Sequence, residues 1–229
     1  MSEAPKSVAI ITTSTRTPRI GPSVAAVVKS LLDAPAKESN VVLAPVDLAD
    51  FNLPVYNESI VPAMIDPSKP DSPRFAHPQS IAWSDEIKRH DAYVLVIPEY
   101  NYGLTGGTKN AIDYLMHEWV GKPVAVISYG VQGGAWASGQ AAHVLSNMKL
   151  RVAETKPQLG FAGGRGPEMF GAVLKGELGE ETKKLWAGEE KKAQILEAFE
   201  QLKTMMLNPV PVPVEGGEEK TEGEGEGGK

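Results

Sequence analysis

Hydroxyl and guanidinium groups are concentrated in one short segment near the N-terminus, Thr12–Ser23, which reads TTSTRTPRIGPS. It contains six hydroxyl side chains and two arginines, Arg16 and Arg19. Pro22 suits the first turn of a helix, and a helix N-terminus offers N–H groups and a partial positive charge to an anion. The hydroxyls and guanidinium groups add further donors. Phosphate binding is one interpretation of this segment, and an ordinary polar loop with a helix cap is the other.

The segment does not match the two common phosphate motifs, because neither GxxxxGK[ST] nor GxGxxG occurs in it. A second candidate segment is Pro98–Leu115, PEYNYGLTGGTKNAIDYL. We expect Pro98 to end a strand and Glu99–Gly103 to form a loop. The backbone of this loop and the rings of Tyr100 and Tyr102 suit a planar heterocycle, but an aromatic turn before a capped helix explains them too.

A third candidate segment is Ser128–Gln140, SYGVQGGAWASGQ. Glycine has no Cβ, so Gly130, Gly133 and Gly134 allow the backbone to approach a ligand closely. A flexible turn before a helix is the alternative interpretation.

Short apolar runs rich in β-branched residues precede these three segments. Such runs are typical of strands buried on both faces of a parallel sheet. The predicted strands are Ser7–Ile11, Val41–Leu48, Ala92–Pro98, Pro123–Ser128 and a fifth near Leu150–Thr155.

Apolar residues at helical spacing alternate with the predicted strands. The stripes are Val24, Val27, Val28 and Leu31; Ile112, Leu115, Met116 and Trp119; Ala141, Val144, Leu145 and Met148; and Ile195, Phe199, Leu202 and Met206. Strand–helix alternation predicts a doubly wound α/β fold with three layers, α/β/α. Five strands favour a flavodoxin-like parallel sheet with the order 2-1-3-4-5 over the six-stranded dinucleotide fold. Ligands bind such sheets at the carboxyl ends of the strands, where all three candidate segments begin.

Two long stretches, Asn52–Ser80 and Phe161–Gly179, exceed what a minimal version of this fold needs. Loops of this length are often lids, binding loops or subunit contacts. Residues 1–207 form one predicted domain. Residues 208–229 form a predicted disordered tail, because the sequence has little to bury. Six glutamates and two lysines give residues 215–229 a charge of −4, so the rest of the chain carries −2 of the total of −6.

Composition narrows the function classes. The net charge of −6 argues against a nucleic-acid partner. The absence of cysteine excludes disulfides, thiolate zinc sites and cysteine nucleophiles, and the four histidines lack metal-ligand spacing, so we expect no metal. The N-terminus MSEAPKS lacks a signal-peptide pattern, and no apolar run approaches the roughly 20 residues of a membrane span. We expect a cytoplasmic protein with no membrane partner.

The three candidate segments together resemble the NADPH-dependent FMN reductase family of flavodoxin-like proteins, which includes quinone reductases and azoreductases. The resemblance covers roughly residues 8–155. It depends on PEYN at Pro98–Asn101, KNAID at Lys109–Asp113, KPVAVISYG at Lys122–Gly130 and TSTR at Thr13–Arg16, which matches the family's GSxR. The family carries glycine at the position of Thr13, so we expect the phosphate loop to differ there.

The resemblance implies a role for each matching residue. The FMN phosphate would be surrounded by Ser14, Thr15, Arg16, Arg19 and Ser23. The isoalloxazine ring would be bordered, largely by backbone groups, by Pro98, Glu99, Tyr100 and Asn101. The other side of the site would be closed by Ser128, Tyr129, Gly130, Gly133 and Gly134.

The function implied is an NAD(P)H-dependent FMN reductase or quinone reductase, in which hydride moves from NADPH or NADH to FMN and electrons move on to a quinone, azo or similar small-molecule acceptor. The cofactor carries this chemistry, so no catalytic side chain is expected. Family members are typically homodimers or homotetramers. FMN as a released substrate remains an alternative, as does a flavin redox sensor that regulates a partner protein. The sequence does not distinguish NADPH from NADH or identify the acceptor.

Overall fold

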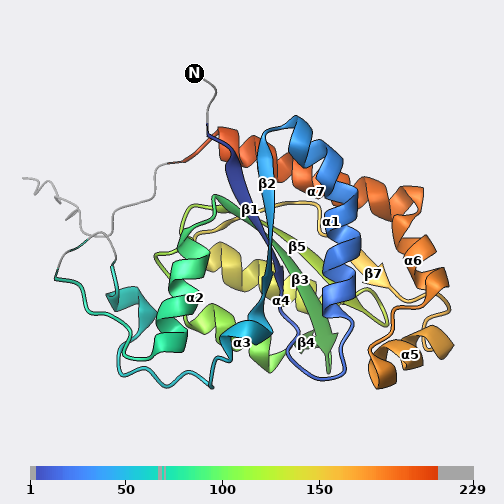
Figure 1. Ribbon diagram of the computed structural model, residues 1–229, viewed down its shortest axis with the longest axis horizontal. Coiled ribbons are helices and arrows are strands. Elements are labelled where there is room, and N and C mark those ends of the chain that lie inside the picture. Colours follow the sequence, from blue (N-terminus) through green and yellow to red (C-terminus); the bar gives the residue numbers. More distant parts are fainter. Residues whose placement is uncertain (1–3, 67–68, 70, 211–229) are drawn as a thin grey trace, which may run out of the picture.

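Five parallel strands form the centre of the molecule in the order β2-β1-β3-β5-β6 (Figure 1). The computed structural model describes residues 4–66, 69 and 71–210. The strands are β1 (Lys6–Thr12), β2 (Val41–Asp47), β3 (Ala92–Tyr100), β5 (Pro123–Gly130) and β6 (Arg151–Val152). Numbered along the chain as predicted, this is the order 2-1-3-4-5, so the predicted flavodoxin-like sheet is confirmed.

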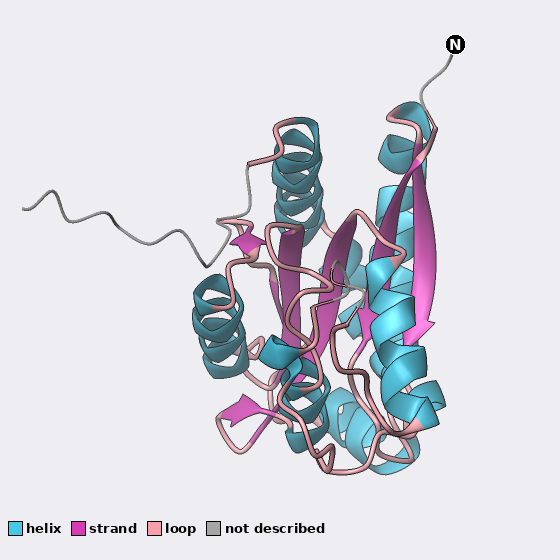
Figure 2. Ribbon diagram, turned by 90° about the vertical axis from the view of Figure 1, so that its left-hand side faces the viewer, coloured by secondary structure: helices cyan, strands magenta, loops and turns pink. Residues whose placement is uncertain are grey.

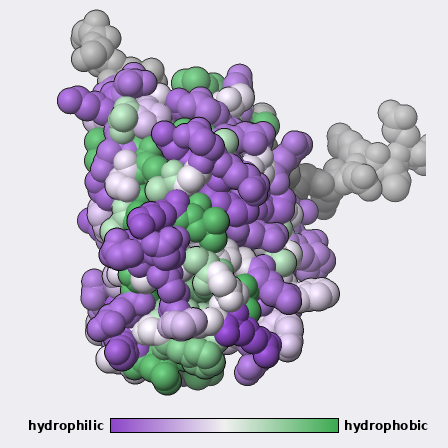
Figure 3. All heavy atoms as spheres, turned by 90° about the vertical axis from the view of Figure 1, so that its right-hand side faces the viewer, coloured by the Kyte–Doolittle hydropathy of each residue, from purple (hydrophilic) through white to green (hydrophobic). Residues whose placement is uncertain are grey.

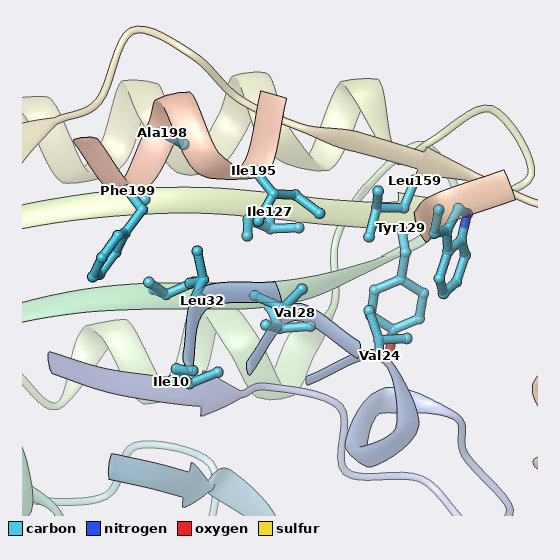
Figure 4. Close-up of a cluster of buried hydrophobic side chains, with 14 of the residues drawn as sticks. Ile10, Val24, Val28, Leu32, Ile127, Tyr129, Leu159, Ile195, Ala198 and Phe199 are labelled. Atoms are coloured by element: carbon cyan, nitrogen blue, oxygen red, sulfur yellow. The ribbon is translucent and has the colours of Figure 1, made fainter. Parts of the chain in front are cut away.

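Helices cover both faces of the sheet, which lies between two helical layers in Figure 2. One layer contains α1 (Gly21–Glu38), α5 (Pro167–Lys175), α6 (Glu180–Ala187) and α7 (Glu189–Leu207); the other contains α2 (Pro78–Lys88), α3 (Gly106–Asp113) and α4 (Ala135–Asn147). Each layer has its own apolar core against the sheet. Figure 4 shows the first core, where Val24 and Val28 of α1 and Ile195 and Phe199 of α7 meet Ile127 of β5. Buried on both faces, the central strands need the continuous apolar runs seen in the sequence.

The prediction that the third strand ends at Pro98 is wrong. β3 continues to Tyr100, and β4 (Gly103–Leu104) pairs with it antiparallel, so residues 99–104 form a hairpin. The Thr13 N–H donates to the Val96 carbonyl, so the backbone polar groups of Val96 point toward β1. Every second residue of a strand points its backbone groups the same way, so the position of the missing Pro98 N–H is also on the β1 side. Pairing between β1 and β3 ends at Val96. The missing N–H of Pro98 therefore lies beyond the end of β1, where it breaks no ladder bond.

The helix predicted from the stripe Ile112, Leu115, Met116 and Trp119 ends earlier than expected, because α3 spans only Gly106–Asp113. Leu115 and Trp119 are buried, but in the turns after the helix. The buried carboxylate of Glu118 accepts hydrogen bonds from the Met116 N–H at 2.9 Å and the Ser84 hydroxyl at 2.6 Å. These bonds fix a turn that the apolar spacing does not reveal.

The fifth strand predicted near Leu150–Thr155 is reduced to β6, and a further strand that was not predicted, β7 (Gln158–Gly160), follows it; both are parallel to β5. Six residue steps separate Val152 from Gln158, but only four separate their partners Val124 and Ser128. The two extra residues bulge out of the ladder, and Pro157 has no N–H to donate within them. The helices α2, α5 and α6 were not predicted.

Polar side chains fix the long stretch Asn52–Ser80 to α3 and hold its two ends together. The Asn110 side chain donates to the Pro54 carbonyl at 2.7 Å and accepts from the Tyr56 N–H at 2.9 Å. The carboxylate of Glu58 accepts from the N–H groups of residues 76 and 77 at the start of α2. Burial would raise the pKa of Glu58, but the Ser80 side chain and these two backbone hydrogen bonds together lower it. The predicted tail lies outside the described residues except for 208–210, and no helix in the described part is long and apolar enough to cross a membrane.

Candidate functional site

The carboxyl ends of β1, β3 and β5 open into a cavity of about 550 Å³. This volume lies in the usual range for small-molecule sites. The cavity is lined by Arg16, Arg19, Ile20, Pro98, Glu99, Tyr100, Asn101, Tyr129, Gly130, Val131, Phe161, Met169, Ala172 and Val173. All three candidate segments contribute to it, as expected from the sheet topology. Phe161, which directly follows β7, and three residues of α5 supply the rest of the lining.

Not all of the sequence-predicted site residues line the cavity. The eight that do are Arg16, Arg19, Pro98, Glu99, Tyr100, Asn101, Tyr129 and Gly130. The six that do not are Ser14, Thr15, Ser23, Ser128, Gly133 and Gly134. The hydrogen bonds and packing of these fourteen residues show which of them are free to contact a ligand and which shape the loops.

Arg16 links two walls of the cavity. Its Nε donates to the Tyr100 hydroxyl at 2.9 Å and its Nη1 donates to the Val173 carbonyl at 3.0 Å. A guanidinium group has five N–H donors, so three remain for a ligand. Arg16 can therefore contact an anion and hold both walls at once.

Arg19 is engaged by the protein itself. Its two terminal nitrogens form a bidentate pair with the Asp47 carboxylate at 2.9 and 2.8 Å, and Nη1 also donates to the Ser14 carbonyl at 2.8 Å. The hydrogen bond to Asp47 raises the pKa of Arg19, although burial opposes it. Because Asp47 balances its charge, Arg19 shapes the loop more than it attracts an anion.

Ser14 is a buried polar residue at the start of α1. Its hydroxyl has no hydrogen-bond partner of normal geometry among the described residues. It lies against Gly21, where any Cβ would overlap it, and beside the Tyr129 hydroxyl. The N–H groups in the first turn of any helix have no intrahelical partners. None of the described side chains caps α1, so these groups have no side-chain acceptor either. An unpaired hydroxyl, an uncapped helix and Arg16 are together suited to a phosphate group.

Tyr129 remains protonated at neutral pH in this environment. Burial raises its pKa to about 12, and the nearby Ser14 hydroxyl, Arg16 and Arg19 only partly offset this effect. Its ring packs toward Val24 in Figure 4. The phenol is therefore available as a hydrogen-bond donor at the edge of the cavity.

Thr13 does not intrude on the phosphate loop, although the sequence suggested a difference there. Its hydroxyl donates to the Val96 carbonyl at 3.2 Å and accepts from the Thr108 hydroxyl at 2.8 Å. The Thr105 hydroxyl in turn accepts from the Thr108 N–H at the start of α3. The side chain thus fastens the loop to α3 inside the core. Thr15 lies beside Gly107 of the same helix and is exposed.

The hairpin of residues 98–104 is fixed to α4 at two points. The Glu99 carboxylate accepts from the N–H groups of Trp136 and Ala137 at 2.8 and 3.1 Å, so it caps α4. The Leu104 N–H donates to the Gln140 side chain at 2.9 Å. Asn101 and Tyr102 both have positive φ, 49° and 62°, as a two-residue hairpin turn of type I′ requires.

The turn after β5 holds itself together. The buried Ser128 hydroxyl donates to the Gly133 carbonyl at 2.7 Å. Gly133 and Gly134 both have a φ of 75°, and a Cβ on Gly134 would lie 2.9 Å from that of Ser128. These three residues shape the turn, whereas Gly130 lines the cavity, with its backbone close to Glu99.

The wall formed by α5 was missed by the sequence analysis. Met169, Ala172 and Val173 have the i, i+3, i+4 spacing of a helix face, but glycine-rich flanks conceal this short pattern. Gly176, with a φ of 71°, lets the chain pack against Pro18 and Arg19 just after α5. That tertiary contact has no signal in the sequence.

The KNAID segment has a structural explanation. Lys109 and Asp113 form an exposed i, i+4 ion pair, and Asn110 holds the Asn52–Ser80 stretch. Within residues 4–66, 69 and 71–210, no group of three or more His, Asp or Glu side chains is arranged to hold a metal ion.

Comparisons with known proteins identify relatives over most of the chain. A sequence model of the NADPH-dependent FMN reductase family matches residues 6–163. The chain is 44% identical over 203 residues to the NAD(P)H-dependent FMN reductase ntnL of Nectria sp, covering 88% of this chain and 98% of that one. It is 29% identical over 156 residues to a quinone reductase of Escherichia coli strain K12, covering 65% and 69%.

Among solved structures, FerB, a flavoenzyme NAD(P)H:(acceptor) oxidoreductase from Paracoccus denitrificans, is similar with a TM-score of 0.54. The identity is 24%, and the match covers 88% of this chain and 95% of that one. At this identity, the likeness supports the fold alone.

Proposed function

The chain belongs to the NADPH-dependent FMN reductase family, and from that premise we propose that it binds FMN in the 550 Å³ cavity at the carboxyl edge of the sheet. It is an NAD(P)H-dependent flavin oxidoreductase that passes electrons to a small-molecule acceptor. The observation that carries the placement is the unpaired Ser14 hydroxyl beside the uncapped α1 and Arg16. The proposal therefore puts the phosphate at this end.

At the phosphate end, the proposal divides the work between the two arginines. Arg16 has three free N–H donors and contacts the phosphate directly. Arg19 holds the loop in shape through Asp47 and the Ser14 carbonyl. Ser14 gains a partner for its buried hydroxyl, which removes the cost of an unsatisfied polar group.

At the ring end, backbone groups of the hairpin supply the contacts. Pro98–Asn101 line the cavity, and the Glu99 bonds to α4 keep this wall rigid. Gly130 leaves the neighbouring wall without a side chain. A rigid, mostly apolar wall with few polar groups suits a flat heterocycle.

When bound, FMN supplies the chemistry of accepting hydride and transferring electrons. The chain's residues bind and orient the reactants, and no side chain is assigned as a general acid or base. We place a quinone, an azo compound or a similar flat molecule as the acceptor.

We further propose that FMN is a resident cofactor rather than a released substrate. The support is α5, which adds a wall to the cavity beyond the three loops. The alternative of a flavin redox sensor that regulates a partner stays a prediction, as do the expected homodimer or homotetramer and the cytoplasmic location. Light scattering with size-exclusion chromatography tests the oligomer.

A visible absorption spectrum of the purified protein tests the proposed function. We expect flavin bands at near-equimolar amount that survive gel filtration and are bleached by NADPH or NADH without oxygen. A colourless protein that takes up no added FMN would refute the cavity as a flavin site. A protein that takes up FMN but loses it on gel filtration would support the released-substrate alternative.

A further inference from the structure

The wall formed by α5 lies outside the part of the chain matched to the family, because that match ends at residue 163 and α5 begins at Pro167. The three loops at the sheet edge lie inside the match. The cavity therefore combines loops that the family model covers with one wall that lies beyond the end of that model.

The two faces of α5 differ sharply. Met169 and Ala172, which line the cavity, are 9% and 1% exposed. Phe170 and Leu174, on the opposite face, are 53% and 70% exposed. The lower part of Figure 3, where α5 lies, shows a hydrophobic patch on this outer surface.

The helix is held firmly at both ends. The Val173 carbonyl accepts from Arg16 at 3.0 Å, and Gly176 packs against Pro18 and Arg19. Near its start, the Glu168 carboxylate accepts from the N–H of Glu181 at 3.0 Å and from both N–H and hydroxyl of Thr182, so it caps α6. A wall fixed in this way limits the size of what the cavity admits.

Met169 lies one helical turn before Val173, whose carbonyl accepts from Arg16, so the two residues are about 6 Å apart along the axis of α5. Met169 shares its apolar cluster with Phe161 and Val131, which also line the cavity. None of these three side chains has a charge or a strong hydrogen-bonding group, so they can sort ligands only by shape and size.

We infer that Met169 of α5 is a specificity-determining residue that sets the size limit for the electron acceptor. This inference rests on the proposed function, because it assumes that the acceptor meets the end of the cavity opposite the phosphate. The acceptor class is a flat quinone. NAD(P)H provides the hydride and water the second proton, so the quinone leaves as the hydroquinone and NAD(P)⁺ is released.

The test compares quinones of one, two and three fused rings as acceptors for the FMN-loaded protein. Met169→Ala should raise kcat/KM for the three-ring quinone relative to the one-ring quinone on the order of 10-fold, through KM, because a change of one or a few methylene groups in an apolar pocket has effects of this size. Met169→Phe should shift the ratio in the opposite direction. Leu174→Ala, on the exposed face of the same helix, is the matched control and should leave the ratio unchanged.

Ferricyanide, a compact oxidant without rings, reports whether the rest of the reaction is intact. Its reduction should be equal in Leu174→Ala and the wild type, and the quinone rates of each Met169 variant are divided by the ferricyanide rate of that same variant. An unchanged quinone ratio in both Met169 variants, or an equal shift in Leu174→Ala, would overturn the inference. Should Met169→Ala fail to fold, Met169→Phe still decides it by the sign of its effect. A wild-type protein without FMN or NAD(P)H oxidation would instead overturn the proposed function, so the two failures are distinguishable.

Discussion

Replacing Arg16 with alanine tests the proposed phosphate site most directly. The substitution removes the guanidinium whose Nε and Nη1 donate to Tyr100 and Val173 and whose three remaining N–H groups are the proposed phosphate donors. A hydrogen bond to a charged group contributes about 1.5–3 kcal/mol. At 1.4 kcal/mol for each factor of ten, the dissociation constant for FMN should rise about 10- to 150-fold. The two existing bonds are exposed, so the fold itself should lose at most about 1 kcal/mol.

The assay is titration of the apoprotein with FMN, followed by quenching of flavin fluorescence, at two salt concentrations. Arg16→Lys keeps the charge but loses the planar fork, so its affinity should lie between those of the wild type and Arg16→Ala. Arg89→Ala removes the same charge from the far end of α2, where Arg89 pairs with Glu86, and should leave FMN affinity unchanged. Tyr100→Phe removes one partner of Arg16 without touching its charge.

Two results would refute this reasoning. An FMN affinity in Arg16→Ala equal to that of the wild type would show that Arg16 does not contact the phosphate. A larger loss of affinity in Arg19→Lys, with thermal stability maintained, would move the phosphate contact to Arg19 and contradict its assignment as a loop-shaping residue.

Three further outcomes are expected. Asp47→Ala should lower the free energy of unfolding by about 1–2 kcal/mol, because it removes the bidentate partner of Arg19. Urea titrations measure this loss. An equal loss when Arg19 is already alanine would show that the two residues are not coupled. Gly134→Ala should destabilise the fold by about 1–3 kcal/mol, since φ is 75° and the new Cβ would lie 2.9 Å from a neighbouring side chain. Gly139→Ala, in α4 with open space at its Cβ, should instead stabilise the fold by about 0.5–1 kcal/mol. Equal melting temperatures of the two variants would contradict this prediction. The pKa of Tyr129 is raised from 10.0 to about 12, so the unfolded chain loses this proton at lower pH than the folded protein. The free energy of unfolding should therefore fall as the pH rises from 10 toward 12, by at most about 2–3 kcal/mol. Melting temperatures measured up to pH 11 should fall less steeply in Tyr129→Phe than in the wild type, and parallel curves would rule out this residue as a cause.

Local patterns in the sequence predicted the sheet and three of the cavity's walls. The apolar runs at Ser7–Ile11, Ala92–Pro98 and Pro123–Ser128 correspond to β1, β3 and β5 because strands buried on both faces need such runs. Since parallel strands end at one edge, the polar segments after them had to meet. Eight of the fourteen predicted site residues consequently line one cavity.

Boundaries and side-chain directions were harder to predict. The spacing of Ile112, Leu115 and Trp119 is helical, but Glu118 turns the chain after Asp113 by accepting the Met116 N–H. Ser128 follows a strand, as a ligand-binding serine would, but its hydroxyl donates to the Gly133 carbonyl instead. Such bonds depend on partners brought together by the fold.

Residue types and their spacing along the chain are enough to predict the order of the strands, the edge at which the site forms and the donors available there. The tertiary structure alone decided which donors remain free. Asp47, 28 residues from Arg19, neutralises one of the two arginines, while Arg16 keeps three of its N–H groups. Val173 lies 157 residues from Arg16, and its helix forms the remaining wall of the cavity. Contacts over such separations arise only after the chain has packed, so no local pattern records them.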